Sequence, residues 1–431
     1  MNGGAGPFTI VIVNDRAYPA GGASKVALES ARGLAARGHD VTVLAAMGPA
    51  SDDLAAAGVK TEVIGQGDLA TGASPAMAIQ GLWNTRAEAK LAEVLSRCPP
   101  GRTVVHIHSW SKALSPSVFA AAGRSGHPVV ATLHDYGFAC PNAALHIFPT
   151  GRPCTLRPMS VPCLTTNCDS RRYHHKLWRV ARQTSLQHVA HAASRLHTAI
   201  CVSDYSHDIL RPLLPPALRT AVIDNPIDTV DEGPADPGAG DGFVYVGRFS
   251  AEKGVLLLAQ ATADLDLPVV FVGEGALDGE IRRINPRAVL TGWLPAAQVR
   301  ARMRAGRALV IPSTWRETQG MVAPEAFAAG LPVIASSDTA PATATRQGLT
   351  GLIFRNGDLD SLKSALTAMA GDAGAARRMG RQAYAAFWSD PPTLGRHLDR
   401  LEALYAQGLA DHAVRRPSPG APSHLGDTTH A

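Results

Sequence analysis

Two glutamates are placed so that they could bind a ligand together. They lie in residues 308–336, ALVIPSTWRETQGMVAPEAFAAGLPVIAS. Glu317 and Glu325 are separated by seven residues, and Gly320 lies between them, ahead of a predicted short helix. The free N–H groups and positive dipole end of a helix N-terminus suit a phosphate. A carboxylate beside that phosphate would accept hydrogen bonds from sugar or ribose hydroxyls. This segment therefore predicts binding of a phosphorylated, hydroxyl-rich ligand.

Two cations have the character of phosphate ligands. Arg248 and Lys253 follow a predicted strand at residues 243–246 and precede a predicted helix at residues 255–262. Arg can bind a diphosphate bidentately and Lys can neutralise it as a point charge. A surface charge pair is the alternative interpretation.

Three histidines accompany two predicted strands of the N-terminal half, residues 104–107 and 129–133. Catalytic groups in parallel sheets lie beyond the carboxyl ends of the strands. His134 is the main candidate there, and His108 is a second. His106 lies inside its strand, where the alternation of side chains favours core packing.

Four cysteines crowd into one Pro-rich segment, namely Cys140, Cys154, Cys163 and Cys168. Four thiolates could form a tetrahedral, structural zinc site. Their spacings are not those of paired Cys-x-x-Cys knuckles, so reduced cysteines without a metal are the alternative.

A basic segment follows the cysteines. Residues 171–197 carry Arg, Lys and His together with Tyr173 and Trp178. Such a helix could contact anionic head groups of a membrane. A solvated helix face that covers a sheet explains the same pattern, and both interpretations stay open.

Short apolar runs alternate with helical patterns along the chain, which predicts α/β architecture with parallel sheets. A stretch rich in Pro, Gly and Asp, residues 229–241, divides the chain into two predicted domains, 1–228 and 242–389. Other predicted strands in the first domain are 8–13, 41–45, 199–202 and 221–223, and predicted helices are 24–37, 76–97, 113–122 and 393–409.

The bulk composition sets limits on function. Of the 431 residues, 45% are hydrophobic and 18% are charged, which is typical of a globular protein. No apolar run approaches the roughly 20 residues that span a bilayer, and the N-terminus lacks a signal-peptide pattern. We expect a cytoplasmic protein. The net charge of +5 is compatible with anionic ligands or an anionic membrane surface. With few aromatics and no long basic run, the composition does not indicate nucleic-acid binding.

Several of these motifs resemble those of one family. Pro312-Ser313, the Glu317-x7-Glu325 spacing and the AFAAGLPVIAS segment are similar to the signature of retaining, nucleotide-sugar-dependent glycosyltransferases of family four, which have the GT-B fold. Gly-Arg-x4-Lys-Gly at residues 247–254 and Leu-His-Asp at residues 133–135 resemble further motifs of that family. The resemblance covers nearly the whole chain.

The resemblance implies two Rossmann-like, doubly wound parallel-sheet domains that face a cleft, with the acceptor on the first domain and the donor on the second. It also implies that a helix at residues 390–410 packs back on the first domain. Residues 411–431 would then form a disordered tail. The cysteine segment resembles an insertion that shapes the acceptor pocket.

The resemblance also implies roles for individual residues. Arg248 and Lys253 would hold the diphosphate, and Glu317 and His134 would contact the donor sugar. Glu325 would accept from ribose hydroxyls. Further donor contacts would come from Gly22, Gly292, Gly320, Met321 and Val322. Trp293, beside Gly292, would stack on the base or pack in the core.

The implied reaction moves a hexose-type sugar to a glycan, a lipid-linked or a small-molecule acceptor, with retention and without a catalytic metal or other cofactor. The family's usual setting is polysaccharide or other glycoconjugate assembly. Thr318 and Gln319 stand where family members often carry a small and an aromatic residue, which leaves the donor sugar open. The alternatives are a nucleotide-sugar epimerase, a phosphorylase, or a non-catalytic relative that only binds sugar nucleotides.

Overall fold

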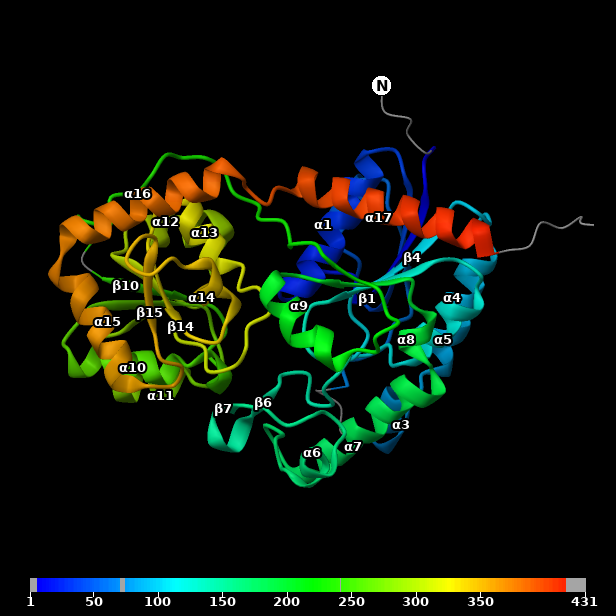
Figure 1. Ribbon diagram of the computed structural model, residues 1–431, viewed down its shortest axis with the longest axis horizontal. Coiled ribbons are helices and arrows are strands. Elements are labelled where there is room, and N and C mark those ends of the chain that lie inside the picture. Colours follow the sequence, from blue (N-terminus) through cyan, green and yellow to red (C-terminus); the bar gives the residue numbers. More distant parts are fainter. Residues whose placement is uncertain (1–5, 70–73, 241, 416–431) are drawn as a thin grey trace, which may run out of the picture.

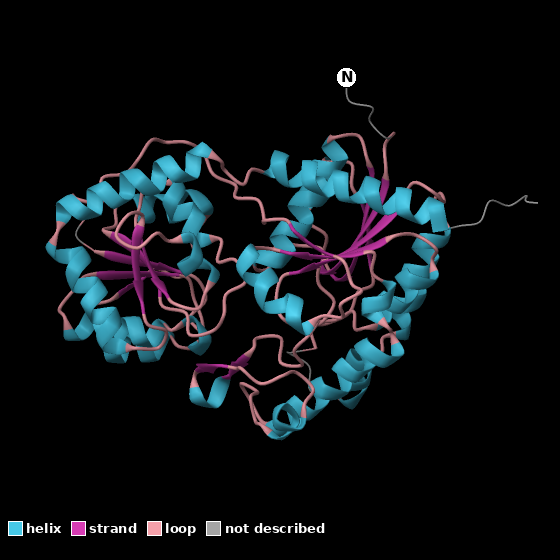
Figure 2. Cartoon of the chain, viewed as in Figure 1, coloured by secondary structure: helices cyan, strands magenta, loops and turns pink. Residues whose placement is uncertain are grey.

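The computed structural model describes residues 6–69, 74–240 and 242–415. Its two α/β domains each contain a parallel sheet enclosed by helices (Figure 2). Most of the predicted tail, residues 416–431, lies outside the described residues. The prediction of two parallel-sheet domains is confirmed.

The first sheet has seven strands in the order β3-β2-β1-β4-β5-β8-β9, and all its neighbours are parallel. Along β1, Val11 and Val13 pack into a core on one face while Ile10 and Ile12 pack into a core on the other. A parallel sheet buried on both faces requires such uninterrupted apolar strands. The strands are β1 (Thr9–Arg16), β2 (Asp40–Met47), β3 (Lys60–Val63), β4 (Thr103–Ile107), β5 (Val129–Leu133), β8 (Thr198–Cys201) and β9 (Thr220–Val222).

Two predicted helices of this domain have wrong boundaries. The pattern at 76–97 is two helices, because Asn84 caps a new helix by accepting from the Ala87 N–H at 3.0 Å. The predicted helix 113–122 begins only after Pro116, since Ser115 adopts a left-handed φ of 75°. The helices are α1 (Gly22–Ala36), α2 (Asp52–Ala56), α3 (Pro75–Leu82), α4 (Thr85–Ser96), α5 (Ser117–Arg124), α8 (Ala192–Arg195) and α9 (Asp204–Leu210).

Between β5 and β8 the chain forms a separate lobe, which lies at the bottom of Figure 1 beside α3. Its elements are β6 (His146–Ile147), β7 (Arg152–Pro153), α6 (Val161–Thr165) and α7 (Tyr173–Thr184). The lobe is tied to α3 because the Trp178 indole donates to the Ala78 carbonyl at 2.9 Å. It contains all four clustered cysteines.

The second sheet has six strands in the order β12-β11-β10-β13-β14-β15. They are β10 (Phe243–Val246), β11 (Val269–Val272), β12 (Val289–Leu290), β13 (Ala308–Ile311), β14 (Val333–Ser336) and β15 (Gly351–Phe354). The helices are α10 (Val255–Asp264), α11 (Asp278–Ile284), α12 (Ala296–Arg304), α13 (Val322–Ala328), α14 (Ala340–Ala344), α15 (Leu359–Gly371) and α16 (Ala373–Ser389).

Each sheet changes its winding direction once, between β1 and β4 in the first and between β10 and β13 in the second. At such a switch point the loops that leave the carboxyl ends of the two strands diverge, and ligands bind in the crevice between them. Gly22 and His108 follow the first pair of strands, while Lys253 and Glu317 follow the second pair.

The last helix, α17 (Leu394–Arg415), lies across the first domain (Figure 1). Leu398, Leu401 and Tyr405 are buried in the core that contains Ile10 and Ile12. The helix extends past the predicted end at residue 410, because Asp411 pairs with Arg219 and with His197, the latter at 3.0 Å. The C-terminal segment is thus part of the first domain's core.

Among the residues that the structure describes, no helix is both long and apolar enough to cross a membrane.

Gly254 lies between Lys253 and α10. A substitution at this position tests how closely the loops after β10 and β13 pack against each other. The φ of Gly254 is +68°, and a Cβ there would lie 1.9 Å from the Pro312 carbonyl oxygen. We expect Gly254→Ala to lower the free energy of unfolding by about 3 kcal/mol, from left-handed strain plus overlap. Urea denaturation measures this change. Gly279→Ala, in α11 with no atom near its new Cβ, is the control and should be neutral or slightly stabilising. Equal effects of the two variants would contradict the close packing.

Candidate active site

A buried ion pair lies at the switch point of the second sheet. Lys253 Nζ is 2.8 Å from Glu317 Oε1, and the Glu317 side chain is 7% exposed. The Ser313 hydroxyl donates to the same carboxylate oxygen. Burial alone would raise the pKa of Glu317, but the Lys253 charge and these hydrogen bonds lower it below its ordinary value. Glu317 is therefore ionised and held in one position.

Gly320 allows the loop after Glu317 to fold tightly. Its φ is +67°, and a Cβ there would lie 2.4 Å from Pro341 Cγ and 3.0 Å from Glu317 Oε2. A side chain at this position would displace the Glu317 carboxylate. The loop then enters α13 through Met321 and Val322, as the sequence pattern predicted.

The side chains of Arg248 and Lys253 point in different directions. The Arg248 side chain is 78% exposed, and its nearest carboxylate is Glu252, at 3.5 Å. Lys253 instead faces Glu317 and the ring of Trp315, with Nζ 5.3 Å from the ring centroid. The two predicted phosphate ligands share one loop, but the structure shows no contact between their charged groups among the described residues.

The three histidines form a stack at the carboxyl ends of β4 and β5. His134 Nε2 lies 3.1 Å from His108 Nδ1, and the rings of His106 and His108 are 4.0 Å apart. His106 is bonded to the Tyr405 hydroxyl at 2.6 Å and to the Thr132 hydroxyl at 2.8 Å. These bonds give His106 a structural role in the core, as its place in the strand indicated.

Burial controls the charge of this stack. It lowers the pKa of His106 and of His134 to about 3, with a further contribution from nearby His397, and it lowers the pKa of His108 as well. His134 is therefore a neutral hydrogen-bonding group near pH 7, and its Nε2 is already engaged by His108.

The two domains meet at the loop that contains Glu317. The Thr318 hydroxyl donates to the His134 carbonyl at 2.8 Å. The Gln319 amide accepts from the Asn225 N–H at 3.2 Å and donates to its carbonyl at 3.3 Å. These bonds hold the His134 backbone of the first domain against the loop of the second domain that carries Glu317.

Other predicted donor contacts lie around this junction. Gly22 begins α1, and a Cβ there would be 2.9 Å from Met321 Cε across the domain boundary. Glu325 lies on α13, where burial raises its pKa although Lys25 opposes the shift. Gly292 is bridged to Gly273, which follows β11. Trp293 is 71% exposed, which removes core packing as its role.

The four cysteines converge on one small cavity, together with Lys176. Lys176 is 1% exposed, and its Nζ lies 3.0 Å from Cys168 Sγ and 2.9 Å from the Cys163 carbonyl oxygen. An ammonium between the thiols would repel a zinc ion, so this arrangement does not fit zinc. Within residues 6–69, 74–240 and 242–415, no cluster of three or more His, Cys, Asp or Glu side chains is arranged to hold a metal ion.

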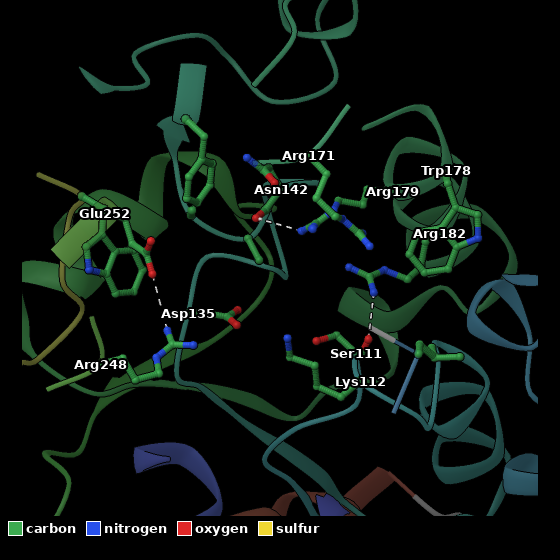
Figure 3. Close-up of a pocket in the computed structure, with 15 residues that line it drawn as sticks. Ser111, Lys112, Asp135, Asn142, Arg171, Trp178, Arg179, Arg182, Arg248 and Glu252 are labelled. Atoms are coloured by element: carbon green, nitrogen blue, oxygen red, sulfur yellow. Dashed lines mark hydrogen bonds and ion pairs between the residues drawn. The ribbon is translucent and has the colours of Figure 1, made fainter. Parts of the chain in front are cut away.

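A cavity of about 260 Å³ lies between the cysteine lobe and the second domain (Figure 3). Sequence reasoning missed it as a site. Its charged lining is Lys112, Arg171, Arg179, Arg182 and Arg248, with Asp135 and Glu252. The repeated arginines of α7 are the available signal, but in the sequence they fit a membrane-facing or solvated helix equally well. Arg182 is instead buried, at 8% exposure.

Family models match both halves of the chain. The model described as Glycosyltransferase Family 4 matches residues 20–231, and the model described as Glycosyl transferases group 1 matches residues 240–372. A GDP-mannose-dependent alpha-mannosyltransferase of Mycolicibacterium smegmatis is 36% identical over 124 residues, which are 29% of this chain and 32% of that protein. The chain thus spans about a third of the length of such curated relatives.

Solved structures share the fold over nearly the whole chain. Sucrose-phosphate synthase of Thermosynechococcus elongatus has a TM-score of 0.66 at 18% identity, covering 94% of this chain and 100% of its own. Anabaena HepE, solved in complex with UDP, has a TM-score of 0.63 at 17% identity, covering 93% and 100%. At these identities the likeness establishes the two-domain GT-B architecture.

The depressed pKa of His106 predicts a pH dependence of stability. In the unfolded chain a histidine binds a proton below about pH 6.5, but folded His106 does so only near pH 3. The contribution of neutral His106 to the free energy of unfolding is therefore complete above pH 6.5 and is lost as the pH falls. At pH 5 we expect the free energy of unfolding to be about 2 kcal/mol lower than above pH 6.5 because of this residue alone.

Urea denaturation at pH 7.5 and pH 5.0 measures that loss. His106→Gln cannot bind the proton, so its stability should fall by about 2 kcal/mol less than that of the natural protein over this interval. An identical fall in both proteins would show that His106 does not titrate in this way.

Proposed function

Because the chain belongs to the group 1, or family 4, glycosyltransferases, we propose that it moves a hexose-type sugar from a nucleoside-diphosphate sugar to a hydroxyl-bearing acceptor, with retention of configuration. The observation that carries this proposal is the Lys253–Glu317 pair at the switch point of the second sheet, with 2.8 Å between the charged atoms. The loop that carries Glu317 is bonded to the first domain at the His134 backbone, so a cation and a carboxylate lie at the boundary between the domains.

The donor diphosphate would be held by the loop after β10. Arg248 is exposed and has only the 3.5 Å contact with Glu252 to exchange for a phosphate. Lys253 would share its ammonium between Glu317 and the phosphate, which keeps both anions compensated. As the bond to the sugar breaks, negative charge grows on the diphosphate, and these two cations stabilise it most at that stage.

The donor's hydroxyls would meet fixed acceptors. Glu317 is ionised and would accept from the sugar, while Glu325 on α13 would accept from the ribose. His134 is neutral near pH 7 and would orient the sugar by hydrogen bonding rather than by proton transfer. Departure of the leaving group would be assisted by charge stabilisation, without a nucleophilic side chain.

A donor panel tests this proposal first. The protein is mixed with UDP-, GDP-, ADP- and TDP-sugars, and thermal shift and nucleotide release are followed. One donor should raise the melting temperature and release its nucleotide slowly even without acceptor, since water can replace the acceptor. A folded protein that responds to none of these donors would contradict a donor site that forms without acceptor.

Arg248→Gln then tests the phosphate assignment. Loss of one charge-assisted contact to the leaving group should lower kcat/KM for the donor by at least tenfold. Folding should be unaffected, because the side chain is 78% exposed. Arg283→Gln removes an arginine that is 73% exposed in α11 and serves as the control. Unchanged turnover in Arg248→Gln would remove Arg248 from the site.

We also propose that the cysteine lobe touches a membrane surface peripherally. Val161 of α6 and Ile79 of α3 are 73% and 67% exposed, and Leu177 and Tyr173 of α7 are 48% and 38% exposed. The Tyr173 hydroxyl donates to the Leu164 carbonyl at 2.6 Å, which joins α6 to α7. Apolar side chains exposed among basic residues suit the interface of an anionic bilayer.

Sedimentation with anionic vesicles tests this contact. The double variant Ile79→Ser/Leu177→Ser should bind several-fold more weakly than the natural protein, since it loses inserted apolar area. Val289→Ser, at a 51% exposed position on edge strand β12, should bind as the natural protein does. Equal binding by all three proteins would rule out the lobe as the contact surface.

A further inference from the structure

We propose that the acceptor carries a phosphate group, and that the pocket in Figure 3 holds this phosphate. This cationic pocket is lined by Lys112, Arg171, Arg179, Arg182 and Arg248. The inference rests on the proposed glycosyl transfer and names the class of its second substrate.

The charge balance of the cationic pocket favours a multiply charged anion. Arg248 lies 3.5 Å from Glu252 and would hold the donor, so the lining that remains for the acceptor has four cationic side chains and one carboxylate, Asp135. A second carboxylate, Asp169, lies beside the pocket, 2.9 Å from Arg179. About two positive charges are left over, which matches a phosphate monoester or a diphosphate. A neutral glycan would leave the surplus uncompensated, and a single carboxylate would balance only half of it.

Arg182 is the clearest sign that the pocket is built for a ligand. Its side chain is buried, yet the groups that it contacts directly are neutral: the Ser111 carbonyl at 2.9 Å and the rings of Trp110 and Trp178, at 5.5 Å and 5.0 Å. No carboxylate of the described residues lies within salt-bridge distance of it. Asp135 and Asp15, from a longer distance, oppose the lowering of the Arg182 pKa by burial, but a buried charge without a direct counter-ion is still costly. Its guanidinium points into the hollow (Figure 3), where it could bind a phosphate bidentately.

The neighbouring cations also favour the binding of an anion in this pocket. Burial and the nearby charge of Arg179 lower the pKa of Arg182 to about 10, so Arg182 stays protonated near pH 7. Lys112 is exposed at the pocket and carries a third positive charge to the same hollow. Mutual repulsion among fixed cations is relieved when an anion binds between them.

The position of the cationic pocket suits the acceptor rather than the donor. Lys112 and Asp135 follow β4 and β5 of the first domain, while Arg179 and Arg182 come from α7. Asp135 is the residue after His134, which the Thr318 bond holds against the donor loop. A phosphate bound here would place the group attached to it beside the proposed donor sugar. Arg248 lies where the two substrates would meet.

Calorimetric titration of the full chain tests the proposal. The probe is glucose 6-phosphate, with glucose as its neutral match, and the donor site is first saturated with the nucleoside diphosphate that the donor panel selects. We expect the phosphate ester to bind, the neutral sugar to be at least tenfold weaker, and the affinity for the ester to fall as salt rises. The double variant Lys112→Gln/Arg171→Gln, at two exposed positions, should weaken ester binding at least tenfold.

Lys60→Gln/Arg378→Gln is the matched control, since it removes the same charge from positions that are both 67% exposed and lie outside the pocket. Equal affinity for glucose and its phosphate would overturn the proposal. So would ester binding that is as tight in Lys112→Gln/Arg171→Gln as in the control.

Two further arms separate related outcomes. Phosphatidylcholine vesicles with and without phosphatidic acid show whether a phosphate presented by a lipid uses the same residues: sensitivity of that binding to Lys112→Gln/Arg171→Gln supports a lipid-borne acceptor phosphate. If no nucleotide binds, the donor assignment fails, and the titration with glucose 6-phosphate alone still decides the pocket. If the nucleotide binds normally and the ester does not, only the acceptor inference fails.

Discussion

The ion pair between Lys253 and Glu317 is the constraint around which the proposed site is organised. It joins the loop after β10 to the loop after β13, with 2.8 Å between the charged atoms. Removing Lys253, whose side chain is 21% exposed, would leave the buried Glu317 carboxylate without its counter-ion, so the pair ties the two loops together. The same loop continues into Thr318 and Gln319, whose hydrogen bonds reach His134 and Asn225 of the first domain. One short segment thus belongs to the proposed donor site and also joins the two domains.

Much of the fold could be predicted from local patterns. The apolar runs at β1, β4, β5 and β13 are strands because parallel sheets bury both faces, and Pro and Gly mark their ends. The errors arose where a single residue overrides a helical pattern. Asn84 starts a second helix within one continuous pattern through a local cap on the Ala87 N–H. Asp411 extends α17 by pairing with His197 and Arg219, which lie just before β8 and β9, and helix propensity does not describe such tertiary contacts.

Some residues of the candidate site could also be found from the sequence, and others could be found only from the fold. Glu317, Lys253 and Gly320 could be named as candidates from the sequence, because their types and their places in the loops after two strands suit a phosphate and hydroxyl groups. The cationic pocket could not, because Lys112, Arg182 and Arg248 come from three separate segments that only the fold assembles. A buried arginine and a solvated one look alike in a sequence. The roles of Thr318 and Gln319 as bridges between domains depend in the same way on which residues face them.

A crystal structure with the nucleoside diphosphate that the donor panel selects would test the central claim most directly. We expect the diphosphate between the two domains, with its terminal phosphate within hydrogen-bonding distance of Lys253 Nζ and the Arg248 guanidinium, and with the ribose hydroxyls on Glu325. A diphosphate bound away from Lys253, with the Lys253–Glu317 pair untouched, would contradict it. Such a result would mean that the pair is a structural link between two loops and that the donor is held elsewhere.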